Sequence, residues 1–208
     1  MQQMSEFLVT QKITPVVNRY LVTAHEGATD DAKDDGTGSG TGKAPILAFA
    51  EQKRLALKER VTLWTGEDRT EEICTYRARN VVDLGPTCDV TGRAGEPIGC
   101  FRKDVKSSML RSTWQLAPEG QPPAVGTERS GGIAIARRAW KVADVVLPFT
   151  VPLPFVFHFD FVRQDRPVLT VERLWGVRDR YRVRIHDPSL DRRLALALSV
   201  ALDAFQSR

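Results

Sequence analysis

Four arginines alternate with other residues near the end of the chain, at Arg178, Arg180, Arg182 and Arg184. On a β-strand, side chains two positions apart point to the same face and lie about 6.6 Å from each other. The four guanidinium groups would therefore form a row roughly 20 Å long on one face of a strand. Guanidinium binds phosphate through two parallel hydrogen bonds, so this row could bind lipid headgroups or a nucleic acid backbone. The competing interpretation is a solvated outer face whose arginines pair with acidic side chains on neighbouring strands.

A second basic cluster lies within a helical pattern in the middle of the chain. Apolar residues between 132 and 144 recur at helical spacing, and Arg137, Arg138 and Lys141 lie on the opposite, polar side. With Trp140 beside them, these cations could anchor a short helix at a membrane surface. A tryptophan that packs into the core is the alternative interpretation.

The sequence contains no recognisable constellation for catalysis or for metal binding. Residues 36–43 resemble a phosphate-binding loop, but Thr37 stands where the motif requires glycine and Ala44 where it requires serine or threonine. The three histidines lack the spacing of metal ligands. His158 and Asp160 share one strand face, which is more typical of a surface pair than of a catalytic base and its partner. We therefore predict no catalytic residues, no metal ion and no cofactor.

Strand patterns dominate the chain before its last twenty or so residues. Between 155 and 161, phenylalanine occupies every second position, which places four rings on one face of a strand. Further strands are predicted at 7–14, 16–24, 168–173 and 177–185, with glycine- and proline-rich turns between strands. A face of four aromatic rings requires a core to pack against.

The C-terminal segment has a different pattern, because leucine, valine and alanine fill most of 194–202. On a 3.6-residue period these large side chains point around the whole helix. Alternating leucine and alanine would also fit a strand, but both are strong helix formers and alanine is depleted in strands. We predict a helix at about 188–206, with Asp187 as its N-cap and Pro188 at its first position. The apolar run is far shorter than the ~20 residues needed to cross a bilayer, so the helix is expected inside the β structure.

The strands and the apolar helix together predict the architecture. Unpaired sheet edges expose backbone groups, whereas a barrel that closes on itself has none. A closed antiparallel β-barrel around a buried C-terminal helix satisfies both the strands and the helix. We therefore predict a mainly β (α+β) fold in a single domain that spans 1–208. Side chains would fill its interior, which leaves the outer surface for recognition.

Charge is distributed unevenly along the chain. Residues 25–43 are rich in glycine and aspartate and carry five acidic and two basic side chains, which predicts a flexible acidic loop of net charge −3. Since the whole chain carries +4, the remainder carries +7, and such a basic body favours anionic partners.

Cysteine usage and the N-terminal sequence indicate the compartment. The three cysteines have no Cys-x-x-Cys spacing, which favours free thiols in a reducing environment. No signal peptide and no transmembrane span are recognisable. We expect a cytoplasmic protein that is peripheral to the membrane where it binds lipid.

Three segments together resemble the tubby-like barrel superfamily, and specifically its scramblase-related and LURP-one-related branch. They read FHFDF at 157–161, GVRDRYRVRI at 176–185 and DRRLALALSVALDAF at 191–205. The order of elements, with the strands first and one apolar helix last, is similar too. The resemblance implies a barrel of about twelve strands around a central C-terminal helix. It also implies a membrane-associated or lipid-binding role, because tubby-like proteins bind phosphoinositides and scramblases act on phospholipids.

Three functional hypotheses follow from the residues and from this resemblance. The leading one is a non-enzymatic domain that binds anionic phospholipid headgroups at a membrane surface through the arginines at 178–184 and the basic cluster at 137–141. The second is a scaffold or regulator that binds protein or, less favoured, nucleic acid. The third is a phospholipid scramblase.

Overall fold

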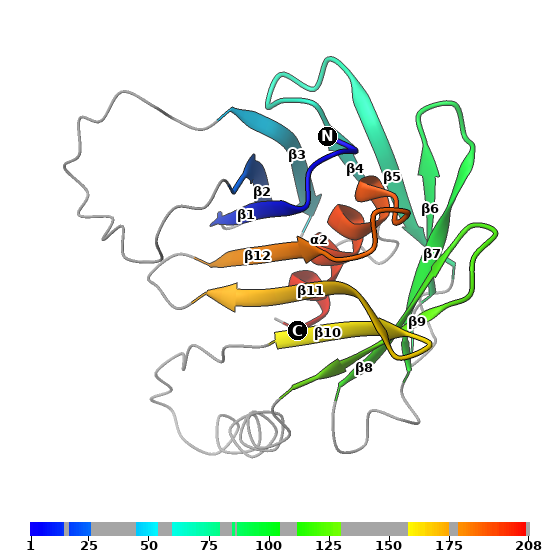
Figure 1. The fold of residues 1–208 in the computed structure, drawn as a ribbon. Coiled ribbons are helices and arrows are strands. Elements are labelled where there is room, and N and C mark those ends of the chain that lie inside the picture. The colour runs from blue at the N-terminus through cyan, green and yellow to red at the C-terminus, as the bar shows by residue number, and fades with distance from the viewer. Residues whose placement is uncertain are drawn as a thin grey trace.

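The computed structural model describes residues 1–14, 17–25, 45–53, 60–79, 85, 87–104, 112–129, 158–174 and 179–206. Within them, twelve antiparallel strands form one closed barrel, and a C-terminal helix lies inside it (Figure 1). The predicted fold class is therefore confirmed. The elements are β1 (Glu6–Ile13), β2 (Val17–Ala24), β3 (Ile46–Lys53), β4 (Arg60–Trp64), β5 (Glu72–Ala78), β6 (Thr87–Gly92), β7 (Pro97–Asp104), β8 (Thr113–Pro118), β9 (Ala124–Glu128), β10 (His158–Arg163), β11 (Arg166–Leu174), β12 (Arg180–Ile185) and α2 (Arg192–Gln206).

The barrel closes through the pairing of its first and last strands. Every other strand pairs with its neighbours in sequence, and β1 pairs with β12 to complete the ring. Glu6 lies opposite Arg184 and Leu8 lies opposite Arg182 in this pairing. Because each described strand has a partner on both sides, the barrel has no open edge that could pair with another chain.

Alternation along the strands fills the interior with apolar side chains. In β10, Phe159 and Phe161 are fully buried, as the phenylalanine pattern predicts. The two earlier phenylalanines of that pattern, Phe155 and Phe157, lie outside the described residues. The ring of Phe161 packs over Gly126 on β9, where an added Cβ would lie 2.3 Å from a ring carbon. Gly126 therefore provides the space that this aromatic ring occupies.

The helix α2 is the central part of the core. Its side chains from Leu194 to Ala204 are buried, and most of them have no exposed surface at all. The helix begins at Arg192, later than the predicted start at 188, because Asp191 and not Asp187 caps it: the Arg193 amide donates to Asp191 Oδ1 at 2.9 Å. Asp187 instead accepts from the Ser189 amide and forms a turn before the helix.

Two predicted strands are observed, and several other predicted segments lie outside the described residues. The strands predicted at 7–14 and 16–24 are confirmed as β1 and β2 with small shifts in their bounds. The last strand begins at Arg180, after the described residue Asp179, and 175–178 lie outside the described residues. The same holds for 26–44 and for 130–157, which include almost all of the predicted acidic loop and all of the predicted helix at 132–144.

Two further observations concern the thiols and the membrane. Cys74, Cys88 and Cys100 form no disulfide with one another, and burial raises the pKa of the Cys74 thiol to about 12. Among the helices formed by the described residues, none has the length and apolar character required to cross a bilayer.

Candidate functional site

The outer face of β12 carries three of the four predicted arginines, Arg180, Arg182 and Arg184, which we call the β12 arginine row. Arg182 is only 6% exposed, and its Nε lies 3.5 Å from Glu6 Oε1 on β1. The Nε of Arg184 lies 3.2 Å from the same oxygen, but the Arg184 side chain is 42% exposed. One carboxylate is thus shared by two guanidinium groups.

Acidic side chains also approach the β12 arginine row from the other neighbouring strand. Glu172 on β11 lies opposite Arg182, with 3.9 Å between the carboxylate and the guanidinium. The row therefore has carboxylates on both flanks, as the competing interpretation of a paired outer face describes. The predicted binding role of these arginines remains a prediction. The other predicted site residues, Arg178, Arg137, Arg138 and Lys141, lie outside the described residues.

An ionic network continues from Glu172 across β10. His158 Nδ1 lies 3.9 Å from Glu172, and His158 Nε2 lies 3.1 Å from Asp160. Asp160 also accepts from Arg129 Nε at 2.9 Å, and from the hydroxyl of Thr170. The pairing of His158 with Asp160 that the sequence predicts is therefore present, and it is one link in a chain of surface charges.

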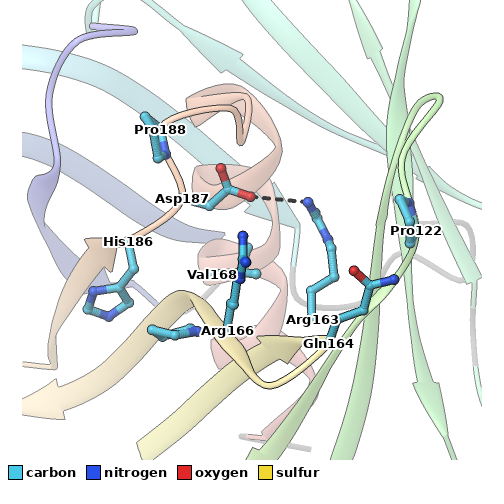
Figure 2. Close-up of a pocket in the computed structure, with 9 residues that line it drawn as sticks. Pro122, Arg163, Gln164, Arg166, Val168, His186, Asp187 and Pro188 are labelled. Atoms are coloured by element: carbon cyan, nitrogen blue, oxygen red, sulfur yellow. Dashed lines mark hydrogen bonds and ion pairs between the residues drawn. The ribbon is translucent and has the colours of Figure 1, made fainter.

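A pocket opens at the end of the barrel where α2 enters, and we call it the turn pocket. Its volume is about 440 Å³, and three connections line it (Figure 2). These are the connection between β8 and β9, the turn between β10 and β11, and the segment from β12 to α2. Its lining residues are Pro122, Arg163, Gln164, Arg166, Pro167, Val168, His186, Asp187 and Pro188.

The turn pocket contains a fixed ion pair. Arg163 and Asp187 point toward one another in Figure 2, with Arg163 Nη1 at 3.1 Å from Asp187 Oδ2. Hydrogen bonds from Ser189 and the charge of Arg163 lower the pKa of the Asp187 carboxyl, so this carboxylate is ionised at neutral pH. Arg166 and His186 are exposed at the same pocket. No pattern in the sequence indicates this pocket.

A second polar cluster lies inside the barrel and was also missed. Asp203 on α2 is 4% exposed and accepts hydrogen bonds from the hydroxyls of Tyr20, at 2.7 Å, and of Tyr181. Tyr20 is further bonded to Gln52 and Gln11. Burial raises the pKa of the Asp203 carboxyl, even though both tyrosine hydroxyls favour its ionised form. A lone aspartate in an apolar helix is the sequence signal that could have revealed this cluster.

Within the described ranges, no group of three or more histidine, cysteine, aspartate or glutamate side chains has an arrangement that could hold a metal ion. The polar clusters described above are linked by hydrogen bonds and ion pairs between protein groups.

Comparison with known proteins gives one match. The family model described as LURP-one-related matches residues 47–203, from β3 into the last turns of α2. Searches of curated proteins and of solved structures returned no match. The match covers well over half of the chain and agrees with the closed barrel around a C-terminal helix. The chain belongs to the LURP-one-related family, which is related to the tubby-like barrels.

Proposed function

We propose that this protein is a non-enzymatic barrel domain that binds anionic phospholipid headgroups at the surface of a membrane. In this proposal it is a cytoplasmic protein that associates with the membrane peripherally. Family membership and the filled interior support a binding role on the outside of the barrel. The side chains of α2 occupy the space that a barrel could otherwise offer to a ligand.

The observation that carries the proposal is the incomplete neutralisation of the β12 arginine row. Glu6 is divided between Arg182 and Arg184, and Glu172 lies near Arg182. Arg180 lies opposite Thr10 on β1 and Leu174 on β11, so the row has three cations for two carboxylates. Glu172 in turn lies near His158 as well as near Arg182. The row therefore keeps an excess of positive charge, and an excess of this kind attracts anionic lipid by about 1 kcal/mol per arginine near the surface.

Arg184 is the member of this row best placed to bind a headgroup. An ion pair on a solvated surface contributes only about 0–1 kcal/mol, so Arg184 can exchange Glu6 for a phosphate at little cost. Arg182, being buried and paired, is expected to hold the strands together rather than to bind lipid.

Vesicle sedimentation tests the proposal. Wild-type protein is expected to sediment with vesicles of phosphatidylcholine and phosphatidylserine, not with phosphatidylcholine alone, and less as the salt concentration rises. The double variant Arg180→Gln/Arg184→Gln is expected to weaken this binding at least about tenfold, because it removes two charges near the membrane. Arg182 is left unchanged, since its replacement would expose Glu6 and Glu172 to each other.

A matched control separates the position of the charges from their number. Arg60 and Arg77 are exposed and lie opposite each other on β4 and β5, far from β12 in the strand order. Arg60→Gln/Arg77→Gln removes the same charge and is expected to bind vesicles like the wild type. Equal loss in both double variants would refute a role for the β12 arginine row. Tight, salt-sensitive binding to duplex DNA without any binding to vesicles would refute the proposed function itself.

A further inference from the structure

The guanidinium group of Arg163 in the turn pocket has unused hydrogen-bonding capacity. Its Nη1 donates to Gln121 Oε1 at 2.8 Å and to Asp187 Oδ2 at 3.1 Å. Its Nε and Nη2 are buried and have no hydrogen-bond partner within the part of the chain that the structure describes. A buried donor without a partner costs about 1–3 kcal/mol, so such a group in a pocket is a candidate for binding an acceptor from outside.

Two more cationic or ionisable groups line the same pocket. Arg166 follows the two turn residues. In the register of the two strands, Arg163 at the end of β10 lies opposite Arg166 at the start of β11. His186 is held by a contact of 3.0 Å between its Nε2 and the hydroxyl of Thr170. With the charge of Asp187 included, the lining carries a net charge of at least +1, which suits a ligand with a singly charged phosphate diester.

An apolar strip lies beside this pocket on the outside of the barrel. Val125 and Val162 are 44% and 39% exposed, and they are the exposed large apolar residues of the described chain other than Met1. They lie directly opposite each other on β9 and β10, and Pro167 on β11 lies opposite Val162. The strip therefore crosses three adjacent strands, and Pro167 belongs both to the strip and to the lining of the pocket.

The combination fits the interface of a phospholipid bilayer. At that interface a charged phosphate lies next to apolar acyl chains, and here a cationic pocket lies next to an apolar strip. A small soluble anion would need only the pocket, so the strip favours a lipid as the occupant.

We propose that the turn pocket binds the phosphate diester of an anionic phospholipid while Val125, Val162 and Pro167 contact its acyl chains. Arg166 and His186 bind the phosphate at the mouth of the pocket, Arg163 binds it deeper, and Asp187 holds Arg163 in place. This inference rests on the proposed function. It adds which end of the barrel contacts the membrane, and that the bound part of the headgroup is its phosphate diester.

The test uses the full-length protein and the phosphatidylserine vesicles described above. Arg166→Gln and the double variant Val125→Gln/Val162→Gln are each expected to weaken vesicle binding at least about fivefold. Arg60→Gln, which removes one exposed charge on the distant strand β4, is expected to have no effect. All substituted side chains are exposed, so unchanged melting temperatures are expected to show that each variant folds.

A second measurement reports contact with the acyl chains directly. In Val162→Trp, the added indole is expected to be quenched by lipids brominated in their acyl chains, beyond the quenching of the wild-type tryptophans. Quenching equal to that of the wild type would overturn the role of the apolar strip.

The outcomes separate this inference from the proposed function. If Arg166→Gln and Val125→Gln/Val162→Gln bind vesicles like the wild type while Arg180→Gln/Arg184→Gln does not, the pocket inference is wrong and the proposed function stands. If the wild type binds the soluble phosphate diester glycerophosphoserine but does not sediment with vesicles, and the valine variants keep full affinity for glycerophosphoserine, the pocket serves a soluble phosphate and lipid docking is overturned. If the wild type binds neither vesicles nor glycerophosphoserine, both proposals fail.

Discussion

Replacing Leu198 by aspartate is expected to prevent the protein from folding into a soluble barrel. Leu198 lies on α2 without any exposed surface, within the main apolar core. The substitution removes a buried leucine, which alone costs about 3–5 kcal/mol, and adds a carboxylate that has no partner in this core. The total is comparable with the ~5–15 kcal/mol that stabilises a typical domain. Soluble yield after expression and thermal unfolding measure this effect.

Leu198→Met is the matched control for this substitution. Methionine has a similar volume and no charge, so the variant is expected to lose less than about 1.5 kcal/mol and to remain soluble. If Leu198→Asp were soluble and melted like the wild type, α2 could not be the buried centre of the barrel.

Replacing Asp203 by asparagine is expected to change how stability depends on pH. Burial raises the pKa of Asp203 in the folded protein above the ~3.9 of an unfolded aspartate. Between about pH 4 and the raised pKa, the unfolded chain ionises Asp203 while the folded protein keeps it protonated. The wild type therefore loses stability as the pH rises through this window, and loses no more above the raised pKa. Asp203→Asn cannot ionise, so the wild type is expected to lose stability relative to the variant as the pH rises through this window.

The groups around Asp203 do not reverse this sign, because burial has the larger effect on its pKa. Tyr20 from β2 and Tyr181 from β12 donate to the carboxyl, and the charges of Asp179 and Arg173 act on it in opposite directions. Urea unfolding of both proteins between acidic and mildly alkaline pH gives the difference directly, and Asp68→Asn in an exposed turn controls for the loss of one carboxyl. If the two free energies of unfolding differed by a constant amount across the window, Asp203 would not titrate in it. If the wild type became more stable relative to the variant as the pH rises, the predicted sign would be wrong.

The fold could be predicted because its determining patterns are local. Alternating phenylalanines and the leucine- and alanine-rich segment each indicate one element, and the need to hide both sheet edges indicates closure. The start of α2 could not be placed as well. Asp187 and Asp191 are both good N-cap residues followed by helix-forming sequence, and only the structure shows that Asp191 caps the helix.

The candidate binding surface could be predicted only in part. The alternation of arginines correctly placed the row on one strand face. The ion pair between Arg182 and Glu6 could not be predicted, because Glu6 lies far away in sequence and is brought close by the pairing of β1 with β12. The turn pocket combines residues from three connections. Pro122 and Asp187, for example, line the same pocket although they lie far apart in the sequence. No sequence pattern on a single element contains such a site.

If the outer surface of the barrel binds the membrane, α2 stays buried in the membrane-bound protein. Amide hydrogen exchange with and without phosphatidylserine vesicles tests it most directly. We predict that the amides of α2 exchange only through global unfolding in both conditions, while amides of β12 and of the turn between β10 and β11 exchange more slowly when vesicles are present. Faster exchange of α2 on addition of vesicles would mean that the helix leaves the barrel, and it would refute binding by the outer surface alone.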